Sequence, residues 1–275
     1  MAKAWFKPLY LNLVIRTHLK KYMTQSFNTK VIISGNCIEL IEYEKTIFSG
    51  RPANKKRSIK KQTTTTTVNE LTVEENKKRS LRRSRTNFRR LVSSNEQLDK
   101  FFSPTFDPKR YPNTTNISYS NKLFNKFIMR LNYKYKNLAY IAVPEYQKDI
   151  DYYGNVKPNG GNIHYHFLCN LQYVPVKTLS EIWGMGGIDI EKINDIENTR
   201  LYLCKYLEKN LNDKRFCGKK KYFTSNNLRR PIELTDILAY GYINKHKHNL
   251  RLDFEKRYLN DHTGEIIHKF YKKIH

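Results

Sequence analysis

Apolar residues recur along the chain at two different spacings, which predict an alternation of helices and strands. Residues 121–132 (NKLFNKFIMRLN) carry apolar side chains three and four positions apart, so we expect an amphipathic helix with its stripe in the core. Residues 198–210 (NTRLYLCKYLEKN) predict a second helix. The run at residues 137–143 (NLAYIAV) is typical of a buried strand, and residues 30–45 predict two short strands around a turn.

Composition shifts along the chain predict four parts. A small N-terminal segment covers residues 1–48. Residues 49–79 are basic and contain five consecutive threonines, which is typical of a linker. The main domain is expected over residues 80–215, followed by a basic C-terminal extension, residues 216–275, packed on it.

The chain is strongly basic, with 51 Lys and Arg against 25 Asp and Glu, a formal net charge of +26. This excess indicates a polyanionic partner, and the 20 tyrosines and 14 phenylalanines suit the stacking of unpaired bases. Residues 80–95 predict a basic helix whose arginines lack acidic neighbours in sequence, although a merely solvated face would look the same. The residues expected to contact DNA phosphates are Arg82, Arg83, Arg85, Arg89, Arg90, Lys219, Lys220, Lys221, Arg229 and Arg230.

The four cysteines form no CxxC pair, so neither a zinc knuckle nor a disulfide framework is indicated, and a reducing cytosol fits best. The first 22 residues are apolar in places, but Lys3, Lys7 and Arg16 interrupt them. We therefore expect no signal peptide, no transmembrane helix and no membrane partner.

The stretch Ile163–Leu168 (IHYHFL) carries the most informative pair of side chains. In a strand, His164 and His166 project from the same face and make half of a metal site. Glu145 precedes them on a strand that would pair with theirs across a hairpin, and Gln147 is an alternative third ligand. Two imidazoles and one carboxylate leave coordination positions open, as a catalytic site with Mg²⁺ or Mn²⁺ requires.

Candidate nucleophiles lie in the predicted helix at residues 198–210. Tyr202 and Tyr206 are four residues apart and therefore share a helix face, with Lys205 close to it. A phenol has a reference pKa of about 10, so a neighbouring ammonium or a metal-polarised phosphate would be needed to favour the phenolate. Two half-buried tyrosines on an amphipathic helix would show the same spacing.

Taken in order, these motifs resemble those of the HUH endonucleases, and in particular the rolling-circle replication initiators of plasmids and single-stranded DNA phages. The resemblance covers roughly residues 80–235. Its first, second and third motifs are Phe101–Phe106 (FFSPTF), His164–His166 (HYH) and Tyr202–Tyr206 (YLCKY), and two further similar stretches are residues 182–187 (IWGMGG) and 218–232 (GKKKYFTSNNLRRPI).

The resemblance implies a role for each site residue. His164, His166 and Glu145 would hold a divalent metal. Tyr202 would attack the scissile DNA phosphate, giving a 5′-phosphotyrosine and a free 3′-OH. Tyr206 would be a second nucleophile for strand transfer, and Lys205 would position the phosphate or neutralise developing charge.

The resemblance also implies an α+β fold of the HUH type, with a central antiparallel, ferredoxin/RRM-like sheet and flanking helices, which we expect on one side. The His pair would lie on a central strand, with Glu145 on its neighbour and the tyrosine helix across the sheet. The substrate would be single-stranded or cruciform origin DNA in the cytoplasm of a bacterial host. No P-loop motif occurs, so unwinding would need a separate host or element-encoded helicase, and extension a host DNA polymerase.

Two alternatives remain open at this point. A relaxase or a single-stranded DNA transposase of the same superfamily would keep the chemistry, although the paired tyrosines favour replication. A non-catalytic nucleic-acid-binding protein would explain the charge without any nicking.

Overall fold

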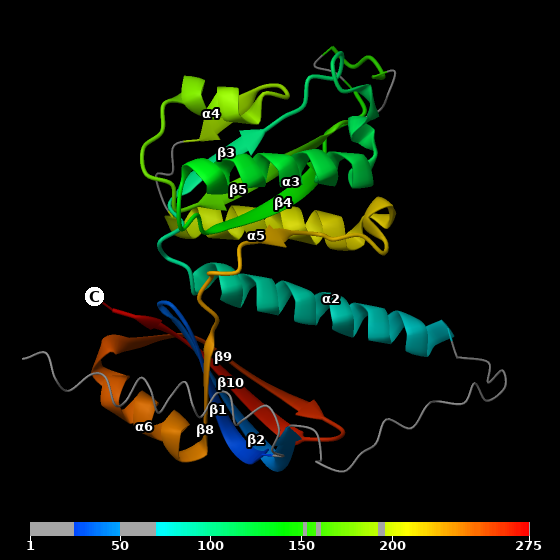
Figure 1. Ribbon diagram of the computed structural model, residues 1–275. Helices are drawn as coiled ribbons and strands as arrows, with labels where there is room; N and C mark the ends of the chain where they lie inside the picture. The colour runs from blue at the N-terminus through cyan, green and yellow to red at the C-terminus, as the bar shows by residue number, and fades with distance from the viewer. Residues whose placement is uncertain (1–24, 50–69, 151–152, 158–160, 192–195, 275) are drawn as a thin grey trace, which may run out of the picture. The chain divides into compact units, whose positions relative to one another are not determined.

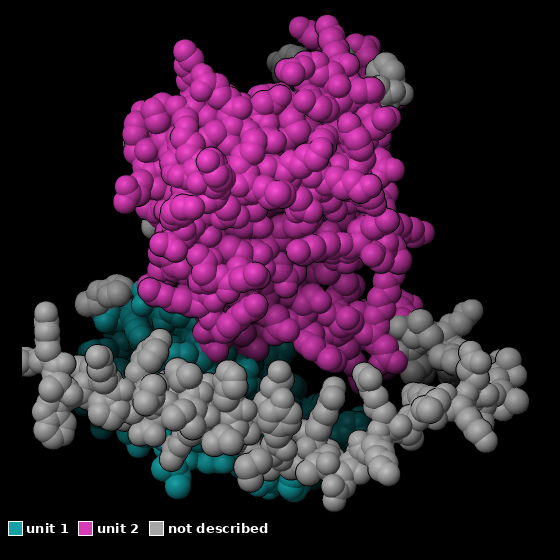
Figure 2. Space-filling view, viewed as in Figure 1, with its two compact units in different colours: residues 1–70, 232–275 teal, residues 71–231 magenta. Residues whose placement is uncertain are grey.

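The computed structural model describes the chain in five stretches, residues 25–49, 70–150, 153–157, 161–191 and 196–274 (Figure 1). Over these residues the protein is mixed α+β, with two antiparallel five-stranded sheets and five α-helices. It divides into two units, one of residues 1–70 with 232–275 and one of residues 71–231 (Figure 2). The α+β class is therefore confirmed.

The larger unit, residues 71–231, is built on a sheet with the strand order β6-β3-β5-β4-β7. Its neighbouring strands are all antiparallel. The strands are β3 (Lys100–Pro104), β4 (Tyr140–Tyr146), β5 (Ile163–Cys169), β6 (Ile188–Glu191) and β7 (Phe223–Thr224), and the helices are α2 (Glu70–Ser93), α3 (Ile117–Lys134), α4 (Val176–Trp183) and α5 (Ile196–Asn212).

Helices cover both faces of this sheet, so the expectation of helices on one side is wrong. On one face Tyr165 and Phe167 of β5 pack against Phe124 of α3 and Trp183 of α4. On the other face lie the alternate strand residues, and the buried side chains that cover them come from α2 and α5, namely Phe88, Leu91, Val92, Leu203, Leu207 and Leu211. Strands that are apolar on both faces need cover on both.

The strand β3 is an interior strand, although Pro104 had suggested a sheet edge. Its ladder with β5 pairs Lys100 to Phe102 and then stops. Pro104 lacks the N–H that would continue the ladder, and contact with β5 resumes at the bridge between Thr105 and His164. On its other side β3 stays paired with β6 through Pro104. The proline is tolerated because it lies in the last position of the strand.

The smaller unit is a second sheet in the order β8-β1-β2-β10-β9. Ala239 packs with Val31 and Leu40 in its core. The elements are β1 (Gln25–Ser34), β2 (Cys37–Ser49), β8 (Ile232–Thr235), α6 (Asp236–His246), β9 (Leu250–Asn260) and β10 (Gly264–Lys273).

The unit boundaries differ from those expected from composition. Residues 232–275 do not form one extension with residues 216–231, because β8 and β10 pair with β1 and β2 from the N-terminal part. The expected linker ends earlier than residue 79, because α2 begins at Glu70. Most of that linker, residues 50–69, lies outside the described residues, as do residues 1–24.

The contact between α3 and β5 makes a test of the core. The Phe124 ring is buried and stacks on Tyr165 at a centroid distance of 4.0 Å. We expect Phe124→Ala to lower the free energy of unfolding by about 3–5 kcal/mol, because it opens a cavity in the core. Tyr133→Ala, on the same helix but 87% exposed, should change it by less than about 0.5 kcal/mol. Urea denaturation of both variants tests this, and equal losses would contradict the packing described.

Candidate metal centre and tyrosine helix

The pairing of β4 with β5 places one carboxylate and two imidazoles on the same face of the sheet. In this register Glu145 lies opposite His164, and Val143 lies opposite His166. Side chains alternate along β5, so Tyr165 points to the α3 face while both histidines point to the face covered by α5. The strand period therefore delivers all three groups to one place.

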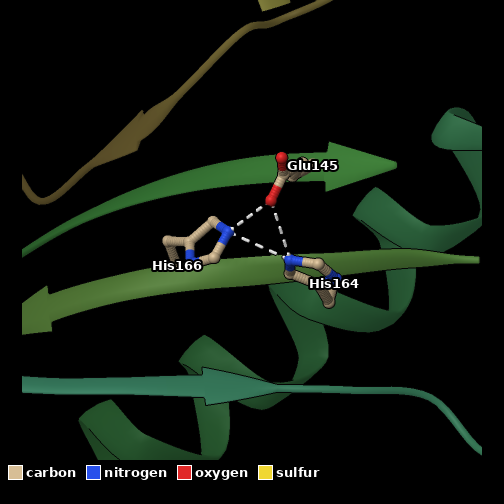
Figure 3. A group of neighbouring side chains, drawn as sticks. All are labelled: Glu145, His164 and His166. Carbon is tan, nitrogen blue, oxygen red and sulfur yellow. Dashed lines mark hydrogen bonds and ion pairs between the residues drawn. The ribbon is translucent and has the colours of Figure 1, made fainter. Parts of the chain in front are cut away.

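The three side chains converge through single atoms (Figure 3). Nε2 of His166 lies 2.7 Å from Oε2 of Glu145, and Nε2 of His164 lies 3.1 Å from the same oxygen. The two Nε2 atoms are 3.0 Å apart. One ligand atom from each residue lies within 4.8 Å of the others, so this group can hold a metal ion.

The donor set fits a divalent cation. Nδ1 of His166 lies 3.3 Å from Oγ of Ser103, so a proton on Nδ1 has a partner there and the Nε2 lone pair faces Glu145. With both imidazoles in this tautomer, two nitrogen lone pairs and a carboxylate oxygen meet with no proton between them. A cation at that point replaces their mutual repulsion with three favourable contacts. Among the described residues, Nδ1 of His164 is buried without a hydrogen-bond partner.

The protonation states also suit a ligand set. Burial raises the pKa of Glu145, but hydrogen bonds from His164, His166 and Lys209 outweigh it and hold that pKa well below its usual value. Burial lowers the pKa of His166, and its hydrogen bond with Glu145 only partly opposes the shift. At neutral pH the carboxylate is therefore ionised and His166 neutral, as metal binding requires.

Both tyrosines of α5 lie against this group. The Tyr206 ring stacks on His166 with a centroid distance of 3.4 Å and an interplanar angle of 14°. The Tyr202 ring lies 6.2 Å from His166 and 4.7 Å from Tyr206, edge-on to both. Tyr202 is 37% exposed and Tyr206 only 6%, so Tyr202 is the more accessible to an incoming strand.

Lys209 is a site residue that the sequence reasoning missed. Its Nζ lies 2.5 Å from Oε1 of Glu145 and 5.0 Å from the centroid of the Tyr206 ring. The signal was present, because a residue seven positions after Tyr202 and three after Tyr206 returns to their helix face. The predicted Lys205 is exposed, and within the described residues it makes no hydrogen bond or ion pair.

Ser103 was also missed as an individual residue, although it belongs to the predicted first motif. It is buried on β3 beside His166, and Phe101 of the same strand stacks on that imidazole at 6.0 Å. Gln147, the alternative ligand, follows the end of β4 and donates its backbone N–H to Asn162. Glu145 is the residue that the structure brings to the imidazole pair.

The residues predicted to contact DNA occupy varied surroundings. Arg82, Arg83 and Arg89 are exposed on α2, whereas Nε of Arg85 lies 3.6 Å from Glu208 of α5. That pair corrects the expectation that this helix lacks acidic neighbours, because Glu208 is remote in sequence. The Arg90 side chain is half-buried.

Past α5, the predicted basic residues are partly engaged within the protein. Lys219 donates to Ser118, Lys220 lies over the Phe223 ring, and Lys221 donates to the Asn210 carbonyl. The backbone N–H of Arg229 donates to Asn95, whereas Arg230 is exposed.

Comparison with known proteins gives one family. Residues 99–211 match the family model described as replication-associated protein ORF2. The match runs from just before β3 to the end of α5, so it includes the metal-ligand group and both tyrosines. It confirms the resemblance to rolling-circle replication initiators and supports a replication initiator role, which implies binding to origin DNA. Neither the curated proteins nor the solved structures contain a match to this chain.

No helix within the described stretches combines the length and apolar character needed to cross a membrane.

The ligand group makes a direct prediction for metal binding. We expect His166→Ala to abolish detectable binding of Mn²⁺, because it removes a ligand that no neighbour replaces. Ser103→Ala should weaken binding by about tenfold or more, since it releases the ring orientation of His166. His248→Ala, an exposed histidine outside the group, is the matched control. Titration calorimetry measures all three, and unchanged affinity in His166→Ala would contradict the site.

Proposed function

We propose that this protein starts rolling-circle replication by nicking and rejoining single-stranded origin DNA through a 5′-phosphotyrosine intermediate. The observation that carries the proposal is the placement of two tyrosines of one helix against a carboxylate–imidazole group suited to a divalent metal. The family match supports the replication role independently of this geometry.

His164, His166 and Glu145 would hold the metal, with Gln147 the less suitable third ligand. When bound, the metal would supply Lewis-acid polarisation of the scissile phosphate and neutralise charge on it. Two imidazole ligands suit Mn²⁺ better than Mg²⁺, which prefers oxygen ligands.

In the proposed reaction the Tyr202 oxygen bonds to the phosphorus of the scissile phosphodiester. The bond from phosphorus to the 3′-oxygen breaks, the phenolic proton leaves to solvent, and a free 3′-OH remains for a host DNA polymerase. The phosphodiester energy is kept in the phosphotyrosine, so attack by a 3′-OH reverses the step. Tyr206 would be the second nucleophile for strand transfer, since it shares the helix face with Tyr202 and contacts the same imidazole.

We assign the two lysines of α5 different roles. Lys209 orients Glu145 through its contact with Oε1, which leaves Oε2 directed at the imidazoles. Lys205 is exposed one turn earlier, where its ammonium can reach the phosphate of a bound strand and neutralise developing charge.

The basic residues of α2 and of the segment after α5 would grip the DNA phosphates. Binding should therefore weaken steeply with added salt. A separate helicase would unwind the duplex, and the reaction would take place in the cytoplasm of a bacterial host.

Two competing functions predict different outcomes. A relaxase or single-stranded DNA transposase would use the same site, and the paired tyrosines favour replication over the single-tyrosine transposases. A non-catalytic DNA-binding protein would account for the net charge but leaves the convergent ligand group without a purpose.

The covalent intermediate gives the decisive test of nicking. A labelled origin strand with Mn²⁺ should give a protein–DNA band that survives denaturation, and Tyr202→Phe should remove it because the attacking oxygen is gone. Tyr206→Phe should retain the first cleavage and lose strand transfer. Tyr133→Phe, exposed on α3, controls for the loss of a phenol. Absence of any band would favour the non-catalytic interpretation, and loss only in Tyr206→Phe would move the first nucleophile to Tyr206.

A second test separates the roles of the lysines. We expect Lys205→Met to slow adduct formation by about tenfold, less than the ~10²–10³-fold typical of an enclosed oxyanion donor, because Lys205 is exposed. Its Mn²⁺ affinity should stay unchanged, since Lys205 touches none of the ligands. Lys177→Met, exposed on α4 across the sheet, should change neither quantity. An unchanged adduct rate in Lys205→Met would remove this lysine from the mechanism.

A further inference from the structure

A cavity of about 300 Å³ lies directly beside the metal-ligand group. It is lined by the chain at the end of β4, residues 145–149, and by the end of α5 with the short 3₁₀ helix η2 (Lys214–Phe216) after it. Glu145 and Lys209 belong both to this lining and to the site already described. A strand whose phosphate lies at the metal site therefore has its neighbouring nucleotide next to this cavity.

One wall of the cavity is a column of stacked planar groups. Phe216 is fully buried and meets the Tyr146 ring edge-on at 5.2 Å. The guanidinium of Arg215 lies over that ring at 3.9 Å. Asp213 fixes the guanidinium in place by accepting hydrogen bonds from Nε at 3.0 Å and from Nη2 at 2.7 Å. A guanidinium plane held in this way is a surface on which a nucleobase stacks.

The charges of the lining favour a base over a phosphate. Its three cations, Lys148, Lys209 and Arg215, are matched by three carboxylates, Glu145, Asp149 and Asp213. Balanced charge gives no net attraction for a phosphate, whereas an uncharged base can use donors and acceptors of both kinds. Nη1 of Arg215 makes no hydrogen bond within the described residues, and Gln147 adds an amide with both a donor and an acceptor.

We infer that this cavity binds the nucleobase next to the scissile phosphate, stacked on the Arg215 guanidinium. The inference rests on the proposed function, since it is that function that places a strand across Glu145 and Lys209. In this arrangement the column Phe216–Tyr146–Arg215 supports the base, and the polar side chains of residues 147–149 face its edge.

The test compares binding of two fluorescent single strands in metal-free buffer, one of random sequence and one abasic strand of the same length. Arg215→Lys keeps the charge and the means to pair with Asp213 but loses the planar surface. We expect it to weaken binding of the base-bearing strand by about tenfold, as for one lost base stack, and binding of the abasic strand by less than about twofold. Arg110→Lys is the matched control, because Arg110 lies over Tyr111 at 5.7 Å but does not line the cavity.

An equal loss for both strands would show that Arg215 contacts phosphate, and no loss for either would show that the cavity is not used; each overturns the inference. The thermal unfolding midpoint of Arg215→Lys should match that of the wild type. Because no metal is present, the result is independent of cleavage. A selective loss without any covalent adduct would keep the base site and reject nicking, whereas an adduct with an unselective Arg215→Lys would reject only the base site.

Discussion

The register between β4 and β5 is the constraint on which the site depends. Opposing Glu145 with His164 sets the carboxylate beside one imidazole, and the strand period brings the second imidazole to the same face. A shift of one residue would turn Glu145 toward the α3 face and separate it from both histidines. The metal-ligand group is thus a property of strand pairing, not of a flexible loop.

The two-sided core holds this register in place. On the α3 face Tyr165, between the two histidines, is buried against Phe124 and fixes the strand from behind. On the opposite face Leu203 and Leu207 anchor α5 in the core, so that Tyr206 lies flat on His166. Packing on one face therefore orients the ligands, and packing on the other delivers the tyrosines. A nucleophile held against a metal site in this way has little orientation left to lose on reaction.

Much of this arrangement follows from sequence patterns that are local. The His-Tyr-His alternation, the preceding strand with Glu145 and the helical spacing of Tyr202 and Tyr206 are short-range signals, and the structure brings these residues together. Helices on both faces were not predicted, because the apolar residues of α2 lie among arginines that suggested a solvated helix. Ser103 and Lys209 reach the site through tertiary contacts, which no local pattern specifies. The pairing of β10 with β2 joins segments more than two hundred residues apart, and composition alone had assigned them to separate parts.

The proposed chemistry depends on His164, His166 and Glu145 together holding one divalent metal. Pulsed electron paramagnetic resonance of the Mn²⁺-loaded protein tests this most directly, because it detects imidazole nitrogen bound to the ion. We predict coupling from two histidine nitrogens in the wild type, reduced to one in His164→Ala. A spectrum without nitrogen coupling, or one unchanged by that substitution, would contradict the shared metal site.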